Sequence, residues 1–124
     1  MTRWLRALRA GPELTLLRAQ RLATVAVPGT RAGTTRARSA GTDLGKPRYA
    51  HLVRELPIEA GTDPGTVLAD AVRLARADGW VVPDQPSTGT WTFDKVVERA
   101  RLHGGVTVQD IGGGPTLVIY LTYR

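Results

Sequence analysis

Two histidines, His51 and His103, are the side chains best suited to acid–base chemistry or metal binding at neutral pH. His51 lies four residues before Glu55, so a strand would place both side chains on one face. A single pair is weak support for a metal, because metal ligands normally recur at short, regular spacing. His103 precedes Gly104, where a helix end would favour a cation. We therefore interpret both histidines as structural positions and predict no metal site.

The sequence shows no recognisable nucleophile or cofactor motif. Cysteine is absent, which excludes thiol catalysis, disulfides and thiolate metal sites. The two serines, Ser39 and Ser87, lie in glycine- or proline-rich segments, and neither occupies a Gly-x-Ser-x-Gly elbow. The sequence thus favours a protein that is not an enzyme and that binds no cofactor.

Three consecutive glycines, Gly112, Gly113 and Gly114, raise the question of a phosphate-binding loop. Such a loop opens onto a helix N-terminus, whose amides and dipole hold the anion. Here the glycines are followed by an alternating, strand-like run over 116–123, and a second such run covers 105–111. The pattern predicts a β-hairpin with the glycines in its turn.

Two tryptophans, Trp80 and Trp91, bracket a polar loop over 83–90 and could form the floor of a ligand pocket with Asp84. Further polar groups for such a pocket are Gln85, Thr88 and Asp94. The alternative is that both tryptophans plug the core at the ends of elements.

The net charge of +6 is distributed unevenly along the chain. Residues 1–48 hold ten basic and two acidic side chains, a balance of +8, whereas residues 49–124 hold seven and nine, a balance of −2. This asymmetry indicates a basic arm joined to a nearly neutral domain. The arm's candidate anion contacts are Arg3, Arg6, Arg9, Arg18 and Arg21.

The arm is predicted over residues 1–47 and the domain over 48–124. Short amphipathic helices are expected near the N-terminus, followed by a disordered linker over 28–47, which contains four glycines and two prolines. Arg18 and Arg21 interrupt the only apolar candidate for a secretory signal, and no run is long enough to span a membrane. An organellar transit peptide remains an alternative, although the abundance of Ala, Arg, Gly and Val indicates a bacterial source. The absence of cysteine fits a reducing compartment, and we expect a cytoplasmic protein.

The domain is predicted to be α+β. Strands are expected over 49–58, 80–83, 105–111 and 116–123, with a helix that begins at Pro64 after an Asp63 cap and ends at Gly79. The stretch 92–103 matches a helical pattern better than a strand pattern, with both possibilities open. The expected fold is a four-stranded, mostly antiparallel sheet in the order βαβαββ, with helices on one face.

These observations predict a small interaction module. Its basic arm would contact an anionic partner, either nucleic acid or an anionic membrane surface, and the domain could form a homodimer through an exposed strand. The alternative is a small-ligand-binding domain or minor enzyme that uses the loop between Trp80 and Trp91.

Overall fold

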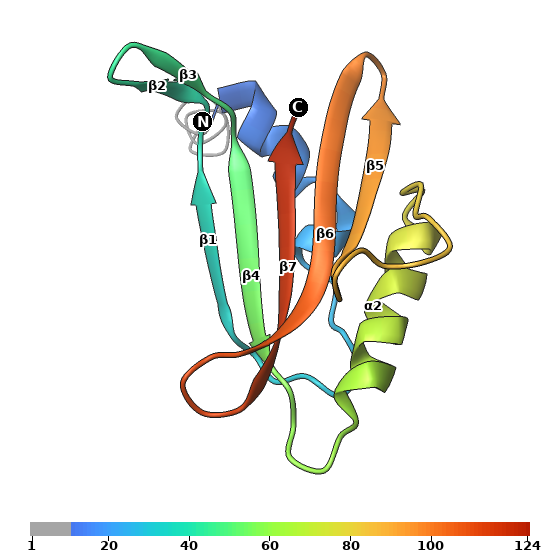
Figure 1. Cartoon of the computed structure of the whole chain (residues 1–124). Helices are drawn as coiled ribbons and strands as arrows, with labels where there is room; N and C mark the ends of the chain where they lie inside the picture. The colour runs from blue at the N-terminus through green and yellow to red at the C-terminus, as the bar shows by residue number, and fades with distance from the viewer. Residues whose placement is uncertain (1–10) are drawn as a thin grey trace, which may run out of the picture.

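A five-stranded antiparallel sheet organises the residues that the computed structural model describes, 11–124 (Figure 1). Its strands, in spatial order, are β1 (Thr34–Arg38), β4 (His51–Pro57), β7 (Pro115–Tyr123), β6 (Ala100–Asp110) and β5 (Trp91–Val97). Two short strands, β2 (Gly41–Asp43) and β3 (Lys46–Arg48), form a separate hairpin between β1 and β4 in the chain. The predicted α+β class and antiparallel sheet are confirmed.

Alternation along β4 determines which side of the sheet is buried. Leu52, Arg54 and Leu56 are buried, whereas the residues between them are partly exposed. Because successive strand residues point to opposite faces, one face of the sheet carries the core and the other does not.

The helix α2 (Pro64–Ala77) covers the core face and packs against β6 and β7. The Asp63 side chain accepts a hydrogen bond from the Thr66 backbone N–H at 3.1 Å, which confirms the predicted N-cap. Gly79, at φ +88°, follows the helix in the left-handed conformation expected of its terminating glycine. Val67, Ala71 and Ala75 form the buried stripe of α2.

The N-terminal segment also lies on the core face. Residues 11–18 are helical, the 3₁₀-helix η1 spans Arg21–Ala23, and this helical segment passes behind β7 in Figure 1. The side chains of Leu14, Leu17, Leu22 and Val27 are buried. The core therefore draws on residues from both sides of the boundary expected at residue 47.

Two cationic side chains tie this segment to the sheet. Arg54, only 7% exposed, donates from Nη1 to the backbone carbonyls of Leu22 at 2.8 Å and Val25 at 2.9 Å. Burial lowers the pKa of the Arg54 guanidinium. Lys95 on β5 donates from Nζ to Gln20 Oε1 at 2.8 Å and to the Asp78 carbonyl.

The predicted count of four strands is wrong, because β1 and β5 join the sheet while the segment 80–83 does not. β1 lies inside the segment 28–47 that was expected to be a disordered linker. Its backbone pairs with β4 from Thr34↔Glu55 to Arg38↔His51, and β2 and β3 pair within the same segment. At Gly33 a Cβ would lie 1.8 Å from the Glu55 carbonyl oxygen, so only glycine allows this close approach. Backbone pairing with a distant strand orders a segment that has few apolar side chains.

The predicted helix over 92–103 is also wrong. The chain forms β5, turns at residues 98–99, and continues as β6, with Glu98 at φ +56° in the turn. Val96 is 67% exposed, while Phe93 packs across the strand pair against Gly104. The predicted strand 80–83 contributes an isolated bridge, Val81↔Asp94, so the order βαβαββ is replaced.

Candidate functional site

The second face of the sheet is not covered by α2 or by the N-terminal helical segment, and we call it the open face. Strand alternation and the pairing registers assign its residues. They are Thr34, Arg36, Arg38, His51, Val53, Glu55, Pro57, Thr92, Asp94, Val96, Arg101, His103, Gly105, Thr107, Gln109, Thr116, Val118, Tyr120 and Thr122.

One row of polar side chains crosses all five strands of the open face. The register pairs run Arg38↔His51, His51↔Thr122, Thr122↔His103 and His103↔Asp94. Pairing thus places the two histidines on either side of β7, although they are distant in sequence.

His103 and Asp94 form a hydrogen-bonded pair in this row. His103 Nδ1 lies 2.8 Å from Asp94 Oδ1, and Arg124 Nη1 lies 3.2 Å from the same oxygen. The neighbouring Thr122 hydroxyl donates to the His103 backbone carbonyl at 3.3 Å rather than to its ring.

Tyr120 lies in the next row, directly over Gly105 of β6. A Cβ on Gly105 would lie 2.5 Å from Tyr120 Cε1 and 2.6 Å from its Cζ and Oη. Burial, and secondly the charge of Asp94, raises the pKa of the Tyr120 phenol. The His103 and Tyr120 ring centroids are 6.0 Å apart.

Positive charge exceeds negative charge on the open face and at its edge. Four arginines, Arg36, Arg38, Arg101 and Arg124, accompany two carboxylates, Glu55 and Asp94. Each carboxylate is already ion-paired, Glu55 with Arg36 at 2.7 Å and Asp94 with Arg124. Among residues 11–124, Arg101 has no ion-pair partner.

Of the arm's predicted anion contacts, the structure describes Arg18 and Arg21, and these two lie away from the open face. Arg18 and Arg21 are exposed on the N-terminal segment, which lies on the opposite side of the sheet, and the Arg21 backbone N–H donates to Asp78 Oδ2 at 3.1 Å. Arg3, Arg6 and Arg9 lie outside the described residues, as does the amphipathic helix expected there.

The predicted pocket residues have different environments. Trp80 is 3% exposed, meets the Phe93 ring edge-to-face with centroids 5.0 Å apart, and donates from Nε1 to Asp78 Oδ2 at 3.2 Å. Trp91 is half-buried on the core face, and Asp84 is exposed. Trp80 thus has the contacts of a core residue with its indole N–H satisfied.

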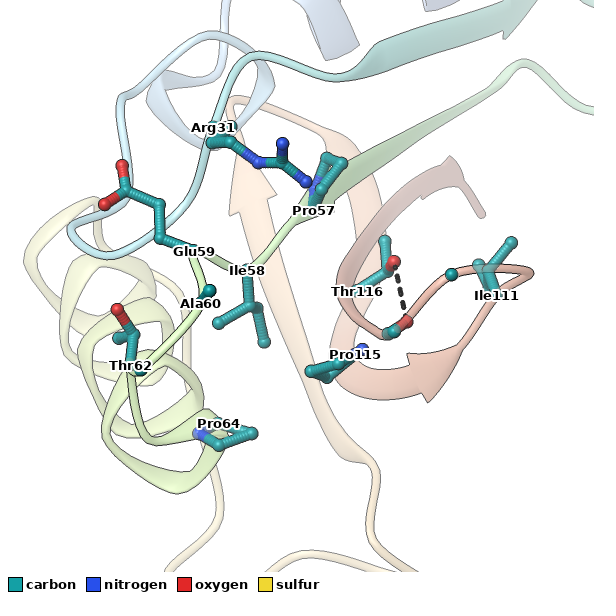
Figure 2. A pocket seen from close by; sticks show the side chains of 13 residues that line it. Arg31, Pro57, Ile58, Glu59, Ala60, Thr62, Pro64, Ile111, Pro115 and Thr116 are labelled. Atoms are coloured by element: carbon teal, nitrogen blue, oxygen red, sulfur yellow. Dashed lines mark hydrogen bonds between the residues drawn. The ribbon is translucent and has the colours of Figure 1, made fainter.

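A concave surface of about 800 Å³ lies elsewhere, where the end of β4, the start of α2 and the β6–β7 turn meet (Figure 2). Ile58, Pro64 and Pro115 supply apolar lining, and the charged side chains at its edge are Arg31 and Glu59. None of the predicted site residues lines it.

The glycine run forms the predicted turn between paired strands. β6 and β7 pair up to Asp110↔Pro115, and the Ile111 N–H donates to the Gly114 carbonyl at 3.3 Å. Gly112 and Gly114 have φ values of +61° and +137°. The glycines therefore open onto a strand and not onto a helix.

Sequence reasoning did not identify the open face as a site. The alternation over 116–123 puts Tyr120 and Thr122 on the same face of a strand. This is the one sequence signal described above that points to the open face. The histidine row was missed because His103 was assigned to a helix end.

Among residues 11–124, no three His, Cys, Asp or Glu side chains gather closely enough to hold a metal ion. No helix in this part of the chain is long and apolar enough to cross a membrane. Comparisons with protein-family models, with curated proteins and with solved structures find no match to this chain.

Proposed function

We propose that this protein is a small, non-enzymatic interaction module that contacts an anionic partner through the open face of its sheet. The observation that carries the proposal is the excess of arginine on this face, where both carboxylates are already ion-paired. Clustered cations attract a polyanion and speed its association. The N-terminal arginines Arg3, Arg6 and Arg9 would add long-range attraction to the same partner.

Other partners fit the open face less well. A homodimer through the β1 edge would bring Arg36 and Arg38 near their counterparts in the second copy, and such charges oppose edge pairing. We also propose that the protein is cytoplasmic, because the absence of cysteine and a polyanionic partner both fit that compartment.

Binding to heparin, a polyanion without bases, tests the proposal. The full-length protein is loaded on a heparin column and eluted with increasing salt, because an electrostatic contact weakens as salt rises. Three double variants each remove two charges: Arg36→Gln with Arg101→Gln on the open face, Arg73→Gln with Arg76→Gln on α2, and Arg3→Gln with Arg6→Gln in the arm.

We expect the open-face variant to elute at clearly lower salt than the α2 variant, with the arm variant between them. Equal shifts for the open-face and α2 variants would show that only net charge matters. Absence of retention of the parent at about 50 mM salt would also contradict the proposal.

A further inference from the structure

Tyr120 presents a flat aromatic surface on the open face. A Cβ on Gly105 would lie 2.5–2.6 Å from Tyr120 Cε1, Cζ and Oη. The Tyr120 ring therefore reaches over strand β6. The hydroxyl end of the ring thus lies beside Gly105, and Tyr120 is partly exposed on the open face. A side chain at residue 105 would displace the ring, which makes the glycine a condition of this arrangement.

Planar and polar groups surround this ring. His103 lies beside it, with the ring planes tilted by 51°, and His51 lies on the far side of β7 in the adjoining row. The hydroxyl-bearing side chains of Thr92 and Thr107 occupy the neighbouring strands. Rings and hydroxyls of this kind stack on bases and hydrogen-bond to base edges.

Guanidinium groups lie on both sides of this surface. Arg36 and Arg38 belong to the edge strand β1, and Arg101 belongs to β6, three strands away, or roughly 14 Å at ordinary strand spacing. Cations on both sides of an aromatic side chain can bind the phosphates of a single nucleic-acid strand while one of its bases stacks on the ring.

We propose that the open face binds single-stranded nucleic acid, with a base stacked on Tyr120 and phosphates contacted by Arg36, Arg38 and Arg101. This inference rests on the function proposed above and specifies its polyanion. A duplex buries its base faces and is read by elements that enter a groove, whereas a five-stranded sheet offers a broad surface. A second copy fits less well, because interface cores are depleted in charged residues and this row contains Arg38, His103 and Asp94.

Binding of two labelled oligonucleotides to the full-length protein tests the inference. One is an oligothymidylate of about twelve nucleotides, and the other is an abasic strand with the same number of phosphates. Fluorescence anisotropy at about 50 mM salt gives both affinities. The variants are Tyr120→Leu, which removes the flat ring, and Tyr120→Phe, which keeps it.

We expect the parent to bind oligothymidylate more tightly than the abasic strand. Tyr120→Leu should weaken oligothymidylate binding by about tenfold, as expected for loss of one stacked base, and leave abasic binding unchanged. Tyr120→Phe should bind like the parent. On the unchanged protein, oligothymidylate and not the abasic strand should shift the Tyr120 ring-proton resonances, a measurement that does not depend on the stability of a variant.

Equal affinity for both strands, with no ring-proton shift, would overturn base stacking and leave the anionic contact standing. Failure to bind either strand or heparin would overturn the proposed function as well. Tighter binding to the matched duplex, to anionic vesicles, or to a second copy through Tyr120 would also overturn the single-strand assignment.

Discussion

At the scale of single residues, the adjacent glycines of β6 serve opposite faces of the sheet. A Cβ on Gly104 would lie 2.8 Å from Phe93 Cε2, on the core side, whereas Gly105 accommodates the Tyr120 ring on the open face. Because neighbouring strand residues alternate between faces, one Gly-Gly pair allows close approach of an aromatic ring on each side. The position of the Tyr120 ring on the open face therefore requires glycine at residue 105.

Tyr120 should ionise at higher pH than an ordinary tyrosine, because burial and the Asp94 carboxylate disfavour the phenolate. Titration by absorbance near 295 nm, compared between the parent and Tyr120→Phe, should differ by one step with a midpoint above about 10. Since the unfolded chain loses this proton first, stability should fall as pH rises above about 10, and Tyr120→Phe should remove that part of the fall. A step at or below the ordinary value would contradict the placement of the ring.

At the scale of elements, the N-terminal segment and the sheet are joined by buried polar contacts as well as by apolar packing. Arg54 occupies a core-facing position of β4 and satisfies two carbonyls at the end of that segment. Burying a cation costs desolvation free energy. The hydrogen bonds from Arg54 to the two carbonyls offset this cost. This arrangement explains why residues 21–25 belong to the folded unit.

Arg54→Met should lower the free energy of unfolding by about 1–3 kcal/mol, because the Leu22 and Val25 carbonyls lose their donor while most of the side-chain volume is kept. Chemical denaturation measures this change, and hydrogen exchange should show faster exchange at the Val25 amide than at amides within α2. A variant as stable as the parent, or more stable, would show that the guanidinium is not needed to hold the segment.

The β6–β7 turn makes a second prediction at this scale. Valine at residue 112 or 114 should destabilise the protein by about 1–2 kcal/mol, because both glycines have positive φ, which strains a β-branched residue. Gly113→Val is the matched control, since Gly113 lacks a positive φ and has open space at its Cβ. Thermal melting should separate the two changes from the control. Three identical melting temperatures would contradict the turn geometry.

At the scale of the whole molecule, local patterns predicted some elements and not their assembly. The cap at Asp63, the start of α2 at Pro64 and the strand over 116–123 are encoded by neighbouring residues, and these predictions are confirmed. β1 pairs with β4, which is distant along the chain, and a glycine count within 28–47 cannot express such pairing. β5 pairs with the next strand, β6, in a hairpin that the helical match over 92–103 did not predict. The open face was not predicted from the sequence, because the residues of its central row come from five different strands.

The central claim is that the open face, and not the helical layer, contacts an anionic partner. Backbone amide shifts recorded by nuclear magnetic resonance during titration with a heparin fragment test this claim most directly, because they report both layers at once. We predict that the largest shifts fall on β1, β4, β6 and β7 around Arg36, Arg38 and Arg101, and that α2 changes little. Shifts confined to α2 and the helical segment 11–23, or no shifts at low salt, would contradict the account.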